Sequence, residues 1–160
     1  MKKLIITLLL ILSSFAVYAQ CNNVQPEIVI FSDDLAKPSR ISFCEDSTDF
    51  LLIQQYNLPT EDYLSTKDNP LFIEGDENLH LKLKLYKSEY YTTENGNKEC
   101  YYYYKITKFN LNQIVTKQIN YIVIYYDYQV ITHELDFKKS IELNYLIETY
   151  YKYKKWKLPK

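Results

Sequence analysis

An alternating run of leucines in the middle of the chain constrains the fold most. Every second residue from Leu79 to Leu85 is a leucine, with polar or aromatic residues between them. A period of two is typical of a β-strand with one buried and one wet face. Asn95-Gly96 follows, and this dipeptide is the strongest short signal of a β-hairpin. The sequence therefore predicts an antiparallel hairpin whose second strand contains the tyrosine run 101–104.

The hairpin can be given a register if Asn95 and Gly96 are its two loop residues. Leu85 then lies opposite Ile106 on the inner face, and Tyr91 lies opposite Cys100. A slip by one residue would bury lysine and expose leucine, so this register is favoured. The outer face is then predicted to carry Lys84, Tyr86, Tyr90, Tyr101, Tyr103 and Lys105.

The remaining segments predict more strands and one long helix. Strands are expected over 25–31, 40–44, 119–126 and 128–135, while 49–56 is ambiguous between strand and helix, and 61–65 resembles one helical turn. Asp136 is a good N-cap for a helix over 137–153. Within that range, Leu143, Leu146, Ile147 and Tyr150 have helical spacing, although alternation over 141–147 leaves a strand open.

We predict an α+β fold, namely one antiparallel sheet of four to six strands with the C-terminal helix packed on one face. A small closed β-barrel is the alternative. No linker rich in Pro, Gly or Ser and no internal repeat divides the chain. Residues 20–160 are therefore expected to form a single β-rich domain.

The first 19 residues have the features of a bacterial secretory signal peptide. Lys2-Lys3 precedes an apolar run over 4–12, and Ala19 suits cleavage before Gln20. The apolar run is shorter than the ~20 residues that a membrane-spanning helix needs. We therefore expect an exported chain, periplasmic or extracellular, with no transmembrane span after cleavage.

The three cysteines also bear on export and on where the mature chain is held. Cys21 follows the cleavage site, so a lipoprotein tethered to the outer membrane is an alternative, although Tyr18 and Gln20 depart from the usual lipobox. Paired thiols form disulfides in an oxidising compartment. We prefer a Cys44–Cys100 disulfide, because Cys21 lies close to the terminus.

Composition and missing motifs narrow the classes of function. The chain carries 19 basic and 20 acidic residues, a net charge of −1, so a nucleic-acid partner is not expected. Its two glycines cannot form a phosphate-binding loop, and the usual serine-hydrolase, zinc-protease and Cys-x-x-Cys motifs do not occur. His133 and Glu134 would lie on opposite faces of a strand. We therefore expect no enzyme, no cofactor and no metal site.

The tyrosines on the predicted outer face are the candidate binding residues, namely Tyr86, Tyr90, Tyr101 and Tyr103. Aromatic side chains clustered on a strand can stack on sugars or form a protein-binding hot spot. Residues 101–160 also carry a net charge of +5, so their basic end is a second candidate surface. The sequence thus predicts a non-enzymatic envelope protein that binds an unknown protein or glycan. A small-ligand or lipid carrier with a barrel-like cavity is the alternative.

Overall fold

The computed structural model describes residues 22–32, 35–45, 48–56, 69–92, 96, 98–126 and 130–156. The predicted signal peptide, Cys21 and the predicted turn over 61–65 lie outside these residues. The elements, in chain order, are β1 (Asn22–Ser32), β2 (Leu35–Glu45), β3 (Asp49–Tyr56), β4 (Leu71–Gly75), β5 (Leu79–Thr92), β6 (Lys98–Lys105), α2 (Lys108–Ile114), β7 (Ile119–Tyr125), β8 (Val130–Glu134) and α3 (Phe137–Tyr153).

The strands form one antiparallel sheet in the order β1-β2-β3-β6-β5-β4-β7-β8. This is more than the four to six strands predicted. β5 holds the two halves together, because Leu79–Leu83 pairs with β4 while the part from Lys84 to Thr92 pairs with β6. Strands occupy the predicted ranges 25–31, 40–44 and 119–125, β8 covers 130–134 of the predicted 128–135, and 49–56 is resolved as β3.

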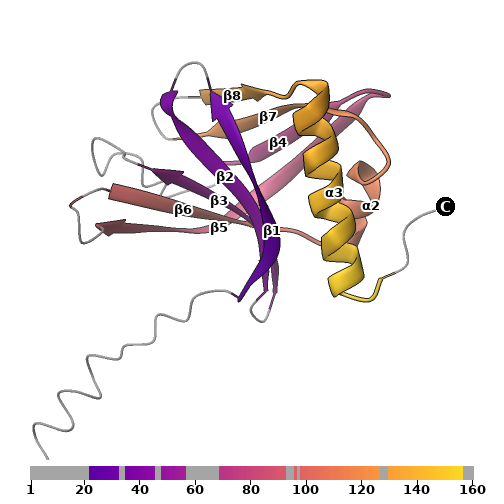
Figure 1. The fold of residues 1–160 in the computed structure, drawn as a ribbon, viewed down its shortest axis with the longest axis horizontal. Coiled ribbons are helices and arrows are strands. Elements are labelled where there is room, and N and C mark those ends of the chain that lie inside the picture. The colour runs from indigo at the N-terminus through magenta and orange to yellow at the C-terminus, as the bar shows by residue number, and fades with distance from the viewer. Residues whose placement is uncertain are drawn as a thin grey trace, which may run out of the picture.

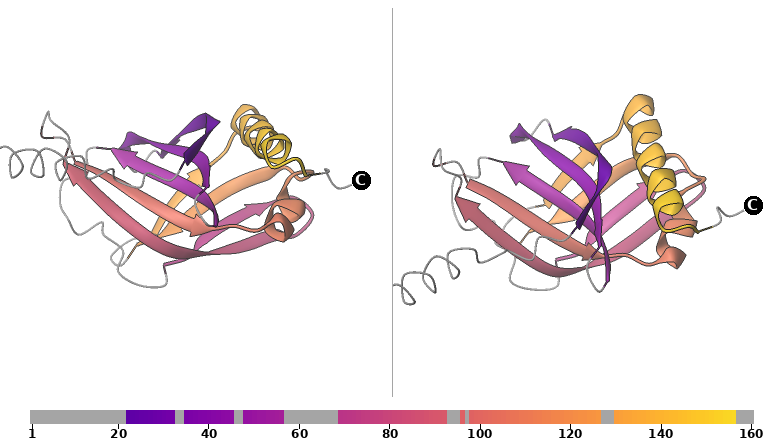
Figure 2. Two further views of the ribbon diagram at one scale, coloured as in Figure 1. Left: turned by 90° about the horizontal axis from the view of Figure 1, so that it is seen from below. Right: turned by 60° about the horizontal axis from the view of Figure 1, so that its bottom comes forward.

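The sheet curls into a half-barrel, and α3 lies across its open side (Figure 2). α3 contacts β1 and β7 from the two ends of the sheet, and β1 also approaches β8. In the described part of the chain β1 and β8 share no ladder of backbone hydrogen bonds. The fold is therefore the predicted sheet with a C-terminal helix, and the closed barrel is not formed.

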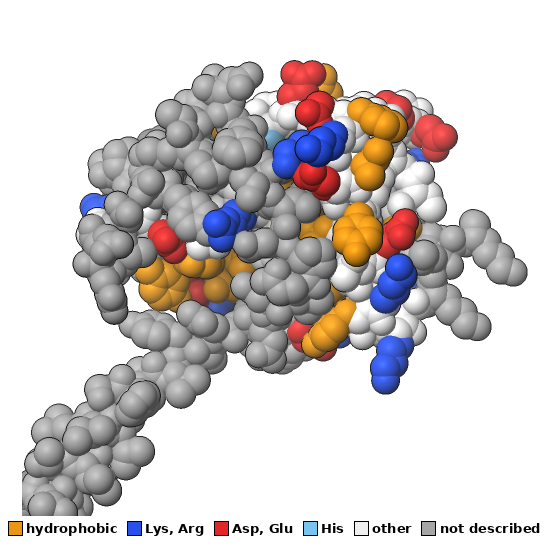
Figure 3. Space-filling view, in the orientation of Figure 1, with side chains coloured by type: hydrophobic (Ala, Val, Ile, Leu, Met, Phe, Trp, Pro, Cys, Tyr) orange, Lys and Arg blue, Asp and Glu red, His pale blue; other side chains and the backbone are white. Residues whose placement is uncertain are grey.

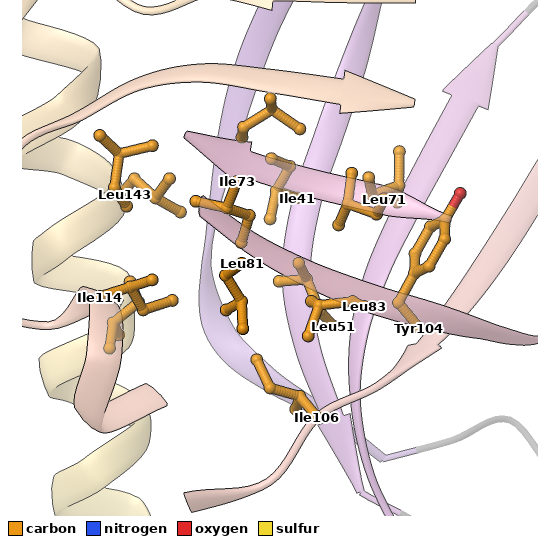
Figure 4. Packing of buried hydrophobic residues seen from close by; sticks show 14 of the residues in the cluster. Ile41, Leu51, Leu71, Ile73, Leu81, Leu83, Tyr104, Ile106, Ile114 and Leu143 are labelled. Carbon is orange, nitrogen blue, oxygen red and sulfur yellow. The ribbon is translucent and has the colours of Figure 1, made fainter. Parts of the chain in front are cut away.

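The core fills the concave side of the sheet (Figure 4). All four alternating leucines of β5 point into it, as their period of two predicts. α3 adds its predicted apolar stripe, Leu143, Leu146, Ile147 and Tyr150. Asp136 caps the helix as predicted, because its side chain accepts a 2.7 Å hydrogen bond from the backbone N–H of Lys139. The strand alternative over 141–147 is therefore wrong.

A polar clamp fixes the last turn of α3 to the end of β2 and the start of β3. The Tyr150 hydroxyl donates to Asp49 Oδ1 at 2.7 Å, and the Tyr150 ring stacks on Phe43 with ring centroids 4.4 Å apart. Lys154 Nζ lies 2.6 Å from Glu45 Oε1 and 2.9 Å from Asp49 Oδ1. Hydrogen bonds and ion pairs between residues about a hundred positions apart thus close the fold.

The predicted hairpin exists, but its register differs from the prediction. Positions 93–97 lie between β5 and β6, so the connection is longer than Asn95-Gly96, and Tyr90 rather than Tyr91 pairs with Cys100. A β-bulge at Tyr86 then shifts the pairing again, and Leu85 faces Tyr104 rather than Ile106. A bulge adds one unpaired residue to one strand, so it exchanges the faces of every residue beyond it.

The structure does not form the preferred Cys44–Cys100 disulfide. Cys44 lies on β2 and belongs to a small cluster on the outer face of the sheet, whereas Cys100 lies on β6 within the main core. β3 separates the two strands. The Cys100 thiol forms no disulfide and is buried beside Tyr102, and burial raises its pKa to about 11. The sheet itself keeps these two sulfurs apart.

Candidate functional site

The candidate site is a patch on the outer face of β3, β6 and β5. Two cross-strand rows define it, Leu52–Tyr103–Lys87 and Gln54–Tyr101–Glu89, because directly paired residues share a face. We call this patch the outer tyrosine face. Its members are Phe50, Leu52, Gln54, Tyr86, Lys87, Glu89, Tyr91, Glu99, Tyr101 and Tyr103.

Glu89 is the first of two carboxylates around which the patch is organised. It accepts hydrogen bonds from Lys87 Nζ at 2.7 Å, the Tyr103 hydroxyl at 2.8 Å and the Tyr91 hydroxyl at 2.9 Å. Partial burial acts to raise the pKa of Glu89, but the hydrogen bonds from Lys87, Tyr103 and Tyr91 outweigh it and leave this pKa below its ordinary value. Glu89 is therefore ionised at neutral pH and holds three neighbouring side chains in place.

Glu99 is the second carboxylate of the patch. Its Oε2 accepts hydrogen bonds from the Tyr101 hydroxyl at 2.8 Å and from Gln54 Nε2 at 3.2 Å. Gln54 Nε2 also lies 2.6 Å from the Tyr101 hydroxyl, which closes a triangle of three side chains. The Tyr91 ring meets the Tyr101 ring edge to face at 5.3 Å, so the two carboxylate networks are in contact.

The other end of the patch is apolar and leaves one ring in solvent. Phe50 is buried against Tyr103, with ring centroids 6.0 Å apart. The Tyr86 ring lies 5.1 Å from the Phe50 ring, yet Tyr86 is 65% exposed. Lys87 Nζ sits 4.4 Å from the centre of the Tyr103 ring, within range of a cation–π contact. Tyr86 is thus held by the bulge as a prominent aromatic side chain at the edge of an ordered array.

The structure brings together three of the four predicted binding residues. Tyr86, Tyr101 and Tyr103 share the outer face, as predicted. Tyr90 does not, because the bulge turns it inward opposite Cys100 and puts Tyr91 outward in its place. Sequence reasoning also missed the two glutamates, since neither the bulge nor the longer connection leaves a recognisable signal in the sequence.

Charge is unevenly distributed along the outer tyrosine face. At one end Lys84 and Lys105 are paired directly across β5 and β6, both exposed, with Lys105 also paired with Phe50. At the other end lie the carboxylates Glu89 and Glu99. The face is therefore bipolar, with cations beyond its apolar end and carboxylates at its hydroxyl-rich end. The lysine pair is itself unfavourable for folding, because like charges directly opposite on neighbouring strands repel.

A second exposed apolar feature runs along α3. Phe137, Ile141 and Tyr145 are spaced four residues apart and are 68%, 51% and 60% exposed. Figure 3 shows hydrophobic side chains on this side of the molecule. These residues face away from the stripe that packs on the sheet, so they add nothing to the core.

The two histidines lie apart from the outer tyrosine face. His80 is exposed, and its Nδ1 lies 3.0 Å from Glu74 Oε1. His133 is fully buried while Glu134 is exposed, so the two lie on opposite faces of β8 as predicted. Within the described segments, no three His, Cys, Asp or Glu side chains are grouped as a metal site would require.

Comparison with known proteins places the chain in no family. No protein-family model matches it, and neither the curated proteins nor the solved structures include a significant match. No helix in the described part of the chain has the length and apolar character needed to cross a bilayer.

Proposed function

We propose that this chain is an exported, non-enzymatic protein of the bacterial cell envelope that binds another protein through its outer tyrosine face. The observation that carries the proposal is the array of hydrogen bonds around Glu89 and Glu99. It fixes three tyrosine hydroxyls and one lysine on the outer face of the sheet, where Tyr91 and Tyr101 are half-buried and Tyr103 is buried. Export is supported by the signal-like residues 1–19.

Preordered tyrosines suit a binding surface for a physical reason. Tyrosine offers a large apolar ring and a polar tip with few rotatable bonds, so it contributes contact area at a low cost in conformational entropy. Immobilising a side chain on binding costs ~0.5–1.5 kcal/mol. The rings of Tyr91, Tyr101 and Tyr103 are already held by carboxylates, so most of that cost is met before the partner arrives.

The bipolar charge of the face favours a protein partner over an uncharged glycan. A complementary surface would place an acidic group near Lys84 and Lys105 and a basic group near Glu89 and Glu99. Exposed Tyr86, at the apolar edge of the array, would supply the apolar contact. Complementary charges steer association and are screened by salt, so we expect binding to weaken as ionic strength rises.

Site-specific photocrosslinking in the bacterial envelope tests the proposal. A benzoylphenylalanine in place of Tyr86 should give one discrete crosslinked product, which Tyr101→Ala/Tyr103→Ala abolishes. The matched control is the same photoreactive residue in place of Phe109 on α2, which is 69% exposed and is not a member of the patch. The proposal fails if position 86 gives no discrete product, if position 109 gives the same product, or if the double substitution leaves it unchanged.

Export is tested separately by the intact mass of the protein recovered from its bacterial host. A chain beginning at Gln20 supports a signal peptide that is removed, and a chain beginning at Cys21 with added acyl groups supports the tethered alternative. A chain that keeps residues 1–19 and stays in the cytoplasm would contradict export under either alternative.

A further inference from the structure

The side of α3 that faces away from the sheet carries a regular line of residues that the core does not use. Its members follow one another at alternating steps of three and four residues, namely Lys138, Ile141, Tyr145, Glu148 and Lys152. All of them are exposed except Glu148, which is half-buried. This spacing keeps successive side chains along one line of a helix, and it is the pattern by which one helix packs against another. We call these five residues the outer seam of α3.

The middle of the outer seam is apolar and uncovered. Ile141 and Tyr145 are 51% and 60% exposed, and Phe137, which lies beside the seam one turn earlier, is 68% exposed. Figure 2 shows no described helix or strand over this side of α3. Single exposed apolar side chains are common, whereas neighbouring ones on one face are typical of a surface that binds protein.

The apolar middle is flanked by opposite charges. Lys138 and Glu148 lie equally far from the midpoint between the two apolar residues of the seam. Neither forms an ion pair within the described residues, whereas the neighbouring Lys139 and Glu142 pair with each other at 2.7 Å. The outer seam therefore presents a cation on one side of its apolar middle and an anion at the same distance on the other side.

This order of side chains is complementary to itself when one copy is reversed. In an antiparallel pair of α3 helices, residues equally far on either side of the midpoint come to the same level. Ile141 then meets Tyr145 of the second copy, and Lys138 meets Glu148 of the second copy. Two-fold symmetry makes each of these contacts occur twice. A parallel pair would instead bring lysine beside lysine and glutamate beside glutamate, where like charges repel.

We propose that this chain forms a symmetric dimer in which two α3 helices pack antiparallel along their outer seams. Ile141 and Tyr145 form the centre of the contact, and Lys138–Glu148 ion pairs close it on both sides. One helix from each copy makes a small interface, so the dimer is weak and depends on protein concentration. Because α3 lies across the open side of the half-barrel, the dimer leaves the outer tyrosine face free for another partner.

Sedimentation equilibrium of the purified chain from ~1 μM to ~1 mM tests the proposal, because this range brackets weak dimers. The wild type should pass from the monomer mass to the dimer mass as concentration rises. Lys138→Glu alone and Glu148→Lys alone each bring like charges together at both ends of the contact, so each should weaken dimerisation about tenfold or more. An equimolar mixture of the two variants should regain the wild-type affinity, because each chain then offers the opposite charge to the other at both ends.

The apolar centre is tested by Tyr145→Ser, which removes a ring from both copies and should weaken dimerisation about a hundredfold. The matched control is Tyr86→Ser, the same change at a tyrosine of the outer tyrosine face that is 65% exposed, which should leave dimerisation unchanged. Circular dichroism checks that each variant folds.

Three results would overturn the proposed dimer. The first is a wild type that stays monomeric over the whole range of concentration. The second is a mixture of the two charge variants that dimerises no more tightly than either variant alone. The third is Tyr145→Ser that dimerises as tightly as Tyr86→Ser. A monomeric wild type would leave the crosslink at position 86 unaffected, so the dimer and the proposed function can fail separately.

Discussion

Alkaline pH should unfold this protein because its tyrosine-rich core cannot ionise in place. Tyr102, Tyr104 and Cys100 are fully buried. Burial raises the pKa of both tyrosines above their ordinary value near 10.0, and raises the pKa of Cys100 from 9.0 to about 11. In the unfolded chain the same groups lose protons at their ordinary values. The native state therefore binds more protons than the unfolded state above pH 9, and the free energy of unfolding falls as pH rises.

The magnitude follows from these three groups. Each lowers the free energy of unfolding by ~1.4 kcal/mol for every pH unit above its unfolded pKa. At pH 11.5 the two tyrosines together lower the free energy of unfolding by ~4 kcal/mol. Cys100 lowers it by a further ~2.7 kcal/mol, a limit that its contribution reaches near the folded pKa of the thiol. The total of ~7 kcal/mol is comparable to the whole stability of a small domain, ~5–15 kcal/mol. Tyr103 and Tyr150 act in the same direction, since burial and a neighbouring carboxylate raise the pKa of each.

The assay combines urea unfolding at pH 8, 10 and 11.5 with absorbance at 295 nm, which reports tyrosinate. The buried tyrosines should ionise only as far-UV dichroism is lost. Tyr104→Phe should remove ~2 kcal/mol of the loss at pH 11.5, whereas Tyr145→Phe on the exposed side of α3 should remove none. A stability that stays flat to pH 11.5 while every tyrosine ionises in the folded state would refute the reasoning.

Three local features of the fold can be tested by urea unfolding of single variants at neutral pH. A Cβ at Gly75 would lie 2.0 Å from a backbone carbonyl oxygen, so Gly75→Ala should cost more than ~2 kcal/mol. Gly96→Ala, in open space at φ +77°, should cost only ~1 kcal/mol, and equal losses would count against the contact at Gly75. Lys154→Met leaves the two carboxylates of the polar clamp without their cation and should lower the free energy of unfolding by ~1–3 kcal/mol. The control, Lys155→Met at an exposed position, should leave the free energy of unfolding almost unchanged. A smaller effect at 154 than at 155 would contradict the clamp. Asp136→Ala should cost ~1 kcal/mol through loss of the helix N-cap, and an unchanged unfolding midpoint would show that the cap contributes nothing.

The elements predicted best from the sequence are those whose pattern is local and repeated. The leucine alternation of β5 and the helical spacing of α3 each repeat over several turns or pleats, so a single irregular residue does not hide them. β4 was missed because Leu71–Gly75 is short and has only two fully buried side chains. Its closeness to β7 depends on Gly75, whose missing Cβ lets the chain approach residue 118.

The candidate site was predicted only in part, because its geometry depends on one irregularity. Strict alternation from Tyr86 would carry Tyr90 to the outer face, and the bulge at Tyr86 reverses this for every later residue of β5. Glu89 and Tyr91 therefore come outward and Tyr90 turns inward. The bulge lies just beyond the point where β5 passes from pairing with β4 to pairing with β6, and no local residue pattern reports it.

The pleat of β6 explains how one tyrosine run can serve two different surfaces. Tyr101 and Tyr103 hydrogen-bond to the outer glutamates, whereas Tyr102 and Tyr104 lie wholly inside the core. Adjacent residues of the run therefore differ in surroundings, so removing their hydroxyls should affect different properties. Tyr103→Phe should weaken the crosslink at position 86, because it removes a hydrogen bond to Glu89. Tyr104→Phe should change the alkaline stability and leave that crosslink intact, so the two faces of the sheet can be tested independently within one strand.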